Sequence, residues 1–367
     1  MVYRVIGLMS GSSLDGLDIA YVQFQETGGK WTYEIVQAGC YPYDDEWMER
    51  LSNATQLNAR DYLLLHTDYG RYIGQIVQTF IMQHSLQYQV QLIASHGHTT
   101  FHIPARKMTG QLGDGAAIAA ETGINTVTDL RAMDIALGGQ GAPIVPIGEK
   151  ILLSEYGFCL NLGGIANISL NDPGQNLAFD VCPANRVLNL LATGLGKSYD
   201  EGGNIARSGK LHEGLLQKLN ALDYYSQPYP KSLANDFGTD TVYPLIKASG
   251  VSVPDGLRTY AEHIALQIKQ SAASLLPMVQ RDTYNLQLLA TGGGAFNQFL
   301  MERLTALLQP LNISVVIPDE NLVQYKEALI MALMGVLRWR EENNVLASVT
   351  GASRNSIGGA VWMGQEA

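Results

Sequence analysis

Three glycine-rich segments of this 367-residue chain have the composition that suits phosphate binding. Ser10-Gly11-Ser12-Ser13-Leu14-Asp15-Gly16 joins two apolar, strand-like runs, and Asn161-Leu162-Gly163-Gly164-Ile165-Ala166-Asn167 does the same near mid-chain. Thr291-Gly292-Gly293-Gly294 follows a third apolar run and leads into a helical stretch. Glycine lets the backbone approach a ligand closely, and N–H groups in such turns or at a helix start attract anions. We therefore predict nucleotide contacts at all three segments, although an ordinary polar hairpin tip explains the first one equally well.

The first segment also carries carboxylates. Asp15 and Asp18 could hold Mg²⁺ through water or position a nucleotide, because Mg²⁺ keeps several waters and needs few carboxylates beside the substrate phosphates. No residue is assigned as a direct protein ligand of a metal. The predicted nucleotide-binding residues belong to the three segments and their continuation, and they are Gly11, Ser12, Ser13, Leu14, Asp15, Gly16, Leu17, Asp18, Gly163, Gly164, Gly292, Gly293 and Gly294.

Three histidines lie within seven residues, at His96, His98 and His102. One interpretation is a zinc site, but their spacing at a strand end rarely closes a tetrahedron, and no cysteine or acidic residue is adjacent. The favoured interpretation is a hydrogen-bonding wall of a ligand cleft, in which His98 contacts the substrate.

The framework that must position these residues is of the α/β class, because short apolar runs alternate with helical stretches. We predict strands over residues 3–8, 19–24, 92–95, 158–162, 167–170, 286–290 and 314–317. We predict helices over residues 59–83, 257–279, 297–308 and 326–340.

The sequence also contains an internal repeat, since each half opens with a strand, a glycine turn and a second strand. This pattern predicts a duplicated fold of two lobes with a cleft between them. We place the N-terminal lobe at residues 1–130, with 346–367 as a candidate return of the chain to it. The C-terminal lobe is placed at 131–345, with the boundary in the segment that contains Gly138-Gly139-Gln140-Gly141-Ala142-Pro143.

Composition excludes several classes of function. The net charge of −10 disfavours nucleic-acid binding, because such a surface repels polyanions. No apolar stretch reaches the roughly 20 residues that a membrane span needs. Three cysteines without paired spacing predict reduced, buried thiols, and the N-terminus opens directly into a strand-like run. We expect a cytoplasmic protein without membrane or nucleic-acid partners.

Longer motifs occur in order along the chain. They begin with Gly7-Leu8-Met9-Ser10-Gly11-Ser12-Ser13-Leu14-Asp15-Gly16-Leu17-Asp18 and Gln111-Leu112-Gly113-Asp114. They continue through Asp129-Leu130-Arg131-Ala132-Met133-Asp134, Gly138-Gly139-Gln140-Gly141-Ala142-Pro143, Phe179-Asp180, Pro230-Lys231-Ser232 and Thr350-Gly351-Ala352. Together, over essentially the whole chain, they resemble the anhydro-N-acetylmuramic acid kinases of bacterial cell-wall recycling.

This resemblance implies a two-lobe, actin-like ATPase (ribonuclease H-like) fold and the use of ATP with Mg²⁺. The implied reaction opens 1,6-anhydro-N-acetylmuramic acid with water and transfers the γ-phosphoryl group to O6, giving N-acetylmuramic acid 6-phosphate and ADP. Asp180 matches the family's catalytic aspartate. Arg131, Asp134 and Glu327 match sugar-binding positions, although Glu327 at a helix start could equally compensate the helix dipole. The resemblance also implies a homodimer.

Two segments depart from the family pattern. Val181-Cys182 replaces a Thr-Gly pair beside Asp180, and Asn235-Asp236 replaces an Arg-Glu pair. His98 stands where the family motif H-G-Q-T has glutamine. These departures leave two alternatives open: a non-catalytic nucleotide- or sugar-sensing module of the same fold, and a kinase for another amino sugar.

Overall fold

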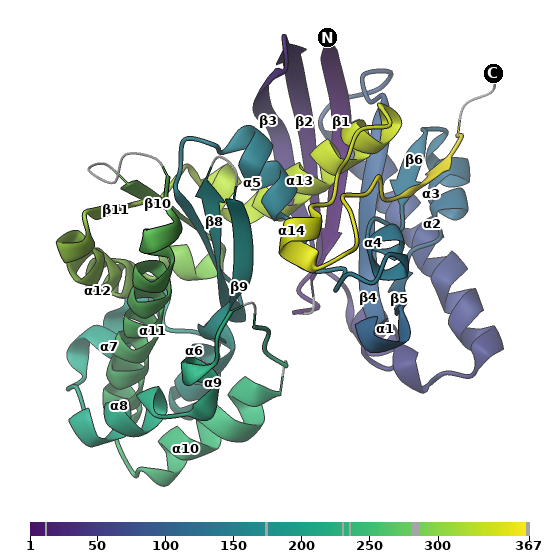
Figure 1. The fold of residues 1–367 in the computed structure, drawn as a ribbon. Coiled ribbons are helices and arrows are strands. Elements are labelled where there is room, and N and C mark those ends of the chain that lie inside the picture. Colours follow the sequence, from purple (N-terminus) through teal and green to yellow (C-terminus); the bar gives the residue numbers. More distant parts are fainter. Residues whose placement is uncertain (12, 173–174, 230, 235, 281–285, 365–367) are drawn as a thin grey trace. The chain divides into compact units, whose positions relative to one another are not determined.

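The computed structural model describes residues 1–11, 13–172, 175–229, 231–234, 236–280 and 286–364 (Figure 1). The chain forms two compact units. The first contains Met1–Leu153 together with the chain from Tyr325 to the C-terminal strand, and the second contains Ser154–Gln324.

The first unit is built on one mixed sheet in the order β12-β6-β4-β1-β2-β3, with β5 paired to β4. Its strands are β1 (Val2–Ser10), β2 (Leu17–Thr27), β3 (Lys30–Tyr41), β4 (Leu92–Ile103), β5 (Met108–Leu112), β6 (Thr126–Thr128) and β12 (Ala360–Trp362). Its helices are α1 (Asp45–Ser52), α2 (Ala59–Gln83), α3 (Gly115–Thr122), α4 (Ala132–Ala136), α5 (Pro146–Leu152), α14 (Ala347–Thr350) and most of α13 (Glu320–Trp339).

The second unit has a five-stranded sheet in the order β11-β10-β7-β8-β9. Its strands are β7 (Phe158–Leu162), β8 (Ile165–Asp172), β9 (Gln175–Pro183), β10 (Leu286–Thr291) and β11 (Ile313–Val316). Its helices are α6 (Asn185–Ala192), α7 (Asn204–Ser208), α8 (Glu213–Asn220), α9 (Asp223–Ser226), α10 (Tyr243–Ala248), α11 (Val253–Leu275) and α12 (Gln298–Leu308).

The two sheets share one topology. In the first, β1, β2 and β3 run antiparallel in sequence, while β4 lies parallel to β1 and β6 parallel to β4. In the second, β7, β8 and β9 form the same antiparallel meander, with β10 parallel to β7 and β11 parallel to β10. This repeated order confirms the α/β class and the predicted duplication, and each unit opens with the predicted hairpin.

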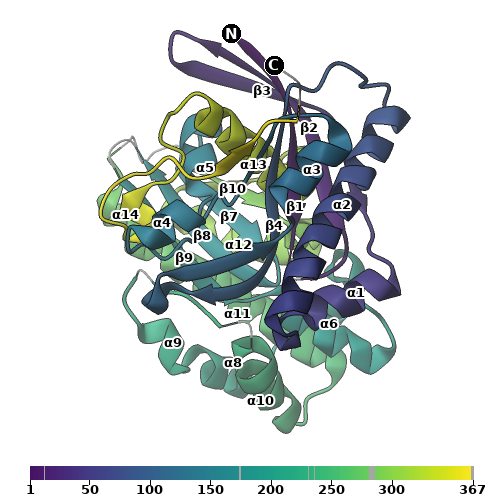
Figure 2. The same ribbon diagram turned by 90° about the vertical axis from the view of Figure 1, so that its right-hand side faces the viewer.

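Helices cover both faces of the first sheet. Figure 2 shows α2 and α3 together on one face of the first sheet. The apolar stripe of α2 (Leu65, Tyr69, Ile73, Val77 and Phe80) belongs to the same core cluster as Ile6 and Leu8 of β1. Helix α13 lies on the opposite face. A Cβ on Gly7 would sit 1.9 Å from the carbonyl oxygen of Ala328, so only glycine permits this approach.

The compact units differ from the predicted lobes because residues 131–153 and 325–345 also belong to the first unit. Helix α5 packs on α13, where a Cβ on Gly148 would lie 2.5 Å from Ile330. A buried ion pair of 2.8 Å joins Lys326 of α13 to Glu149 of α5. Helix α13 leaves helical dihedral angles at Tyr325, where the sequence passes from one unit to the other.

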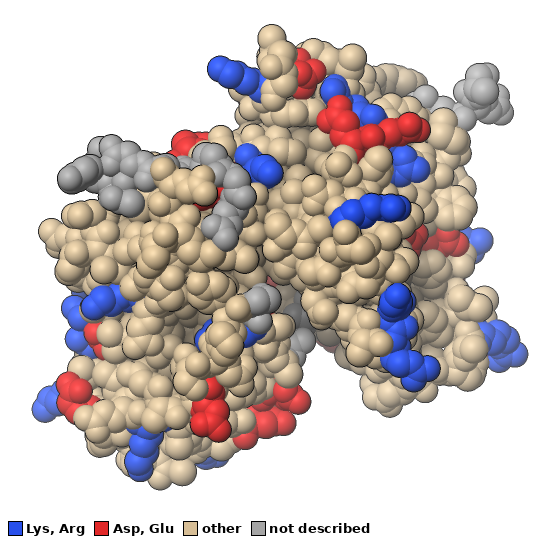
Figure 3. All heavy atoms as spheres, in the orientation of Figure 1, with Lys and Arg blue, Asp and Glu red and all other residues tan. Residues whose placement is uncertain are grey.

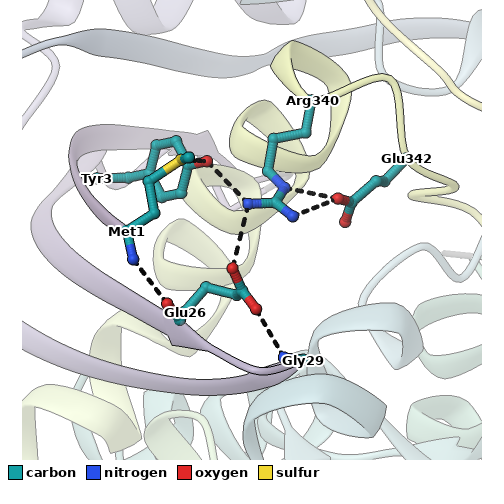
Figure 4. A network of polar contacts seen from close by, with 6 residues as sticks. All are labelled: Met1, Tyr3, Glu26, Gly29, Arg340 and Glu342. Atoms are coloured by element: carbon teal, nitrogen blue, oxygen red, sulfur yellow. Dashed lines mark hydrogen bonds and ion pairs between the residues drawn. The ribbon is translucent and has the colours of Figure 1, made fainter.

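A polar network ties the end of α13 to the first hairpin (Figure 4). Arg340 donates to the hydroxyl of Tyr3 at 2.9 Å and pairs with Glu26 and Glu342. The N-terminal ammonium of Met1 donates to the carbonyl oxygen of Glu26 at 2.7 Å. The contacts of Arg340 with Tyr3 and Glu26 join segments more than 300 residues apart in sequence and hold the end of α13 to the first sheet.

Acidic and basic side chains are interspersed over the described part of the face in Figure 3. Among the described residues, none of the helices combines the length and hydropathy that a bilayer crossing demands.

Candidate functional site

The tip of the first hairpin spans residues 11–16, between β1 and β2. The hydroxyl of Ser13 donates to Asp15 at 2.6 Å, and Leu14 has a left-handed φ of 58°. Gly16 is required for packing, because a Cβ there would lie 2.6 Å from the carbonyl oxygen of Tyr41. Of the predicted nucleotide-binding residues, Ser12 lies outside the described residues.

Leu17, also in the predicted nucleotide-binding set, is the first residue of β2, where strand alternation turns its side chain inward. It is 1% exposed and belongs to the core cluster of the first unit. A nucleotide contact at Leu17 therefore stays a prediction for its backbone and not for its side chain.

Asp18 follows on β2 and pairs in register with Cys40 of β3. Burial raises the pKa of Asp18 to about 6, a hydrogen bond from the Cys40 thiol opposes the shift, and the charges of Asp15 and Glu327 add to it. These carboxyl groups therefore repel one another, and a cation placed near Asp18 would be stabilised.

Arg131 is held from two sides. Its Nε donates to Nε2 of His96 at 2.7 Å, and its Nη1 donates to the carbonyl oxygen of Gly141. Burial lowers the pKa of Arg131 to about 10, against the opposing charges of Glu327 and Asp134, so the guanidinium stays protonated at neutral pH. The Nη1–Nη2 edge keeps N–H donors with the geometry that binds a carboxylate bidentately.

Asp134, predicted to contact the sugar, is fully buried. Its carboxylate accepts from the Gly141 N–H at 2.7 Å and from the Thr350 hydroxyl at 2.6 Å. Gln140 N–H in turn donates to the carbonyl oxygen of Thr350 at 2.8 Å. Asp134 thus links the loop of residues 138–143 to α14 and places Gly141 where its carbonyl oxygen accepts from Arg131. These contacts explain why the motif at Thr350 occurs together with the motif at Asp134.

Glu327 lies on α13 beside the Lys326–Glu149 ion pair. Burial raises its pKa, while the charges of Lys326 and Arg131 lower it. Glu327 therefore lies within electrostatic range of Arg131 and of Asp18.

The three clustered histidines make separate hydrogen bonds. His96 Nδ1 bonds to the carbonyl oxygen of Gly97 at 2.9 Å, His98 Nδ1 to Ser10 Oγ at 3.0 Å, and His102 Nδ1 to Thr109 Oγ1 at 3.1 Å. In the described part of the chain, no group of three or more His, Cys, Asp or Glu side chains could hold a metal ion. The three imidazoles thus have separate hydrogen-bond partners, and a ligand contact of His98 stays a prediction.

In the second unit, the Gly163-Gly164 turn lies between β7 and β8. The N–H groups of Ala184 and Asn185 donate to the carbonyl oxygens of Gly164 and Gly163 at 2.8 and 3.1 Å. The Asn185 amide donates to the carbonyl oxygen of Leu162 at 2.8 Å. The start of α6 is thereby fixed to the turn.

The triple glycine meets this same turn. A Cβ on Gly292, whose φ is +80°, would lie 2.5 Å from Asn161 Oδ1, and one on Gly294 would lie 2.7 Å from Leu162 Cβ. The structure thus brings the second and third predicted segments together, and glycine is needed there for close backbone approach.

A cavity of about 670 Å³ opens beside these glycines, within the second unit. Its lining includes Gly293, Gly294 and the exposed rings of Tyr199 and Phe296. The charged side chains among its described lining residues are all acidic (Asp200, Glu201 and Glu320). Such a lining suits an uncharged aromatic base and sugar hydroxyls better than phosphate groups.

Asp180 lies on β9, paired in register with Asn167 of β8. Its Oδ2 accepts from the Leu233 N–H at 2.9 Å and from the Ser232 hydroxyl at 3.2 Å. Oδ1 accepts no hydrogen bond from the described residues. Burial raises the pKa of Asp180, and the two hydrogen bonds oppose that shift. One carboxylate oxygen is thus anchored while the other can act as a base.

The departures beside Asp180 are accommodated by packing. Val181 and Cys182 are 1% and 0% exposed and belong to the core of the second unit. The Tyr224 hydroxyl donates to the carbonyl oxygen of Asp180 at 2.5 Å. In the second departing segment, Asn235 lies outside the described residues.

Motif matching did not identify several residues that build this site. Tyr224, which donates to the carbonyl oxygen of Asp180, lies in a segment without a distinctive motif. His96, which accepts from Arg131, was predicted only as a member of the histidine cluster and the H-G-Q-T motif. Tyr199 and Phe296 line the cavity and were not predicted. The signal that could have identified them is an aromatic residue beside a polar or glycine-rich segment.

Sequence comparisons with known proteins point to one family. The family described as anhydro-N-acetylmuramic acid kinase matches residues 3–364. The anhydro-N-acetylmuramic acid kinase of Coxiella burnetii (strain Dugway 5J108-111) is 34% identical, over 99% of this chain and 98% of that protein. That of Aliivibrio fischeri (strain ATCC 700601 / ES114) is 35% identical, over 98% and 99%. Among solved structures, the activator of 2-hydroxyisocaproyl-CoA dehydratase from Clostridium difficile with bound ADPNP gives a TM-score of 0.46 at 13% identity, over 92% and 96%.

Proposed function

The chain belongs to the anhydro-N-acetylmuramic acid kinase family, and from this premise we propose that it is an ATP-dependent kinase acting on 1,6-anhydro-N-acetylmuramic acid. Water adds to the anomeric carbon, the C1–O6 bond of the anhydro ring breaks, and O6 takes the γ-phosphoryl group. The products are N-acetylmuramic acid 6-phosphate and ADP. The reaction belongs to peptidoglycan recycling.

The observation that carries the proposal is the state of Asp180. Its Oδ2 is pinned by Leu233 and Ser232, and its pKa is raised by burial. A base with a raised pKa removes a proton from water more readily, and such groups contribute roughly 10²- to 10⁴-fold to rate. We propose that Oδ1 of Asp180 accepts the proton of the attacking water.

Arg131 supports a substrate that carries a carboxylate. With Nε on His96 and Nη1 on Gly141, the guanidinium is oriented before any ligand binds. Bidentate pairing with the lactyl carboxylate is its proposed role. Asp134 is proposed as a positioning residue behind it, and Glu327 as a contact for a sugar hydroxyl.

The nucleotide is assigned to the glycine segments. We propose that adenosine occupies the cavity of about 670 Å³ beside Gly293 and Gly294, since that size suits a small-molecule ligand. The turns at residues 11–16 and 163–164 are proposed to receive phosphate oxygens through backbone N–H groups.

The residues around the first hairpin fit Mg²⁺. Asp18 is a half-buried carboxyl near two further carboxyl groups, those of Asp15 and Glu327, and carboxylate oxygens are the ligands that Mg²⁺ prefers. When bound with ATP, the ion would neutralise charge on the phosphates. Asp18 would hold it directly or through water, with Asp15 close by.

The described cysteines are free thiols; Cys159 and Cys182 are buried as predicted, whereas Cys40 is exposed, so the prediction of burial was wrong for Cys40. Free thiols fit the cytoplasm, where ATP is available. Cell fractionation tests that location. The homodimer implied by the family stays a prediction for light scattering of the purified protein.

An ADP-release assay tests the function. The purified protein with ATP and Mg²⁺ is supplied with 1,6-anhydro-N-acetylmuramic acid, with N-acetylmuramic acid, with N-acetylglucosamine, or with no sugar. We expect ADP only with the anhydro sugar, and a product mass that includes one water and one phosphoryl group. ADP formation at the same rate in every arm would contradict the proposal, and a preference for another sugar would redefine the substrate.

A further inference from the structure

A chain of buried hydroxyl groups runs behind the first hairpin. Ser10 ends β1, Tyr43 follows β3, and Tyr69 lies on α2. The hydroxyls of Tyr69 and Tyr43 are 2.5 Å apart, Tyr43 donates to Ser10 Oγ at 2.8 Å, and Ser10 Oγ lies 3.0 Å from Nδ1 of His98. All four residues are buried, so their hydrogen bonds are not exchanged with solvent.

The direction of the chain follows from counting hydrogens. A hydroxyl has one hydrogen, and that of Tyr43 goes to Ser10, so Tyr43 accepts from Tyr69. Ser10 already accepts from Tyr43, and its own hydrogen is directed at Nδ1 of His98. If Nδ1 of His98 donated to Ser10 instead, the hydrogen of the Ser10 hydroxyl would lose His98 as its acceptor. A buried donor left unpaired costs about 1–3 kcal/mol.

This direction decides the tautomer of His98. Burial lowers the pKa of His98 to about 4, so the ring is neutral at pH 7 and carries one hydrogen. Because Nδ1 accepts from Ser10, that hydrogen must be on Nε2.

His96, two residues away, is held in the opposite form. Its Nε2 accepts from Arg131 Nε at 2.7 Å, which places its hydrogen on Nδ1, facing the carbonyl oxygen of Gly97. A ring nitrogen that accepts from a guanidinium cannot itself carry a proton. The two histidines are therefore fixed as complementary tautomers by neighbours of different kinds.

We propose that the Tyr69–Tyr43–Ser10 relay locks His98 as the Nε2–H tautomer, so that it donates to an acceptor oxygen of the sugar substrate. The relay residues are positioning residues, and their substrate role rests on the proposed function. The family motif has glutamine at the position of His98, and a glutamine amide also offers an N–H donor. His98 would supply an N–H donor at the same position through Nε2, and the relay would exclude the Nδ1–H tautomer, in which Nε2 carries no hydrogen.

The tautomers can be observed directly. Long-range ¹H–¹⁵N correlation spectra of the full-length protein at pH 7 distinguish protonated from bare ring nitrogens. His98 and His96 are assigned by the signals lost in His98→Gln and His96→Gln. We expect hydrogen on Nε2 of His98 and on Nδ1 of His96. Hydrogen on Nδ1 of His98, with Ser10 turned toward Tyr69, would overturn the relay whatever the enzyme does.

Tyr43→Phe removes the donor to Ser10 and keeps the ring. The spectrum should then show both tautomers of His98, and KM for the sugar should rise about tenfold while KM for ATP is unchanged. Tyr72→Phe is the matched control, because its ring also lies 6.1 Å from that of Tyr43 while its hydroxyl forms no hydrogen bond with the described residues. A single, unchanged tautomer in Tyr43→Phe would refute the relay's control of His98.

A second pair covers the case in which Tyr43→Phe does not fold. His98→Gln keeps an N–H donor and should bind the sugar at least about tenfold more tightly than His98→Leu. Equal sugar affinity of the two variants would contradict the donor role. If the wild-type protein phosphorylates none of the sugars, the proposed function fails, yet the spectra still decide the relay.

Discussion

Replacing Gly7 by alanine should destabilise the first unit strongly. The new Cβ would lie 1.9 Å from the carbonyl oxygen of Ala328 and 2.8 Å from the backbone nitrogen of Ala332. Ordinary contact begins at 3.4 Å, so α13 would have to retreat by about 1.5 Å. The obstacle is helix backbone, which cannot rotate away as a side chain can.

Overpacking typically costs about 1–3 kcal/mol, and we expect Gly7→Ala to reach or exceed about 3 kcal/mol. Glu327 directly precedes Ala328, so the retreat should also displace Glu327 from Arg131 and raise KM for the sugar. Both effects come from one helix and should appear together.

Urea unfolding measures the stability, and ADP release measures the activity. Gly39→Ala is the control, because Gly39 is also a strand glycine of the first sheet and a Cβ there would meet only Tyr41, at 3.7 Å. If Gly7→Ala unfolds at the same urea concentration as Gly39→Ala, the packing argument for Gly7 and α13 is refuted.

Two further predictions concern buried charge. Lys326→Met should destabilise by about 3–5 kcal/mol, because it removes the cation that is paired with the buried Glu149 carboxylate. Adding Glu149→Leu should recover most of that loss in urea unfolding, and no recovery would argue against the ion pair as the cause. Burial lowers the pKa of His263 to about 3. Below pH 6.5 the unfolded chain therefore binds a proton at His263 that the folded chain does not bind. As the pH is lowered, this residue should reduce the free energy of unfolding by up to about 1.4 kcal/mol per pH unit. Between pH 6.5 and pH 5, His263→Gln should lose about 2 kcal/mol less than the wild type, and equal losses would contradict that titration.

Much of the framework was predictable because its signals are local. Residues 59–83 form α2 as predicted, and residues 158–162 form β7. Both have periodic apolar patterns bounded by polar or glycine residues. The strands β3, β5, β6, β9 and β12 were not predicted. Of these, β6 and β12 are only three residues long, too short for a period to show.

The site was predictable only where a motif carries it. Gly16 and Gly292 were predicted to bind a nucleotide, yet both have steric reasons for being glycine that depend on segments far away in sequence. Asp134 reads as a ligand contact in a motif, whereas its burial against Thr350, 216 residues later, appears only in three dimensions. The Tyr69–Tyr43–Ser10 relay could not be predicted either, because its residues are distant in sequence and meet only in the folded chain.

The central claim is that Asp180 removes the proton from the water that opens the anhydro sugar. The most direct test is sugar-dependent ADP formation by Asp180→Asn, with ATP affinity measured in parallel and exposed Asp240→Asn as the control. We predict a loss of at least about 10²-fold in turnover with ATP affinity unchanged, and wild-type rates in the control. An Asp180→Asn protein that keeps more than about a tenth of wild-type turnover would contradict the account.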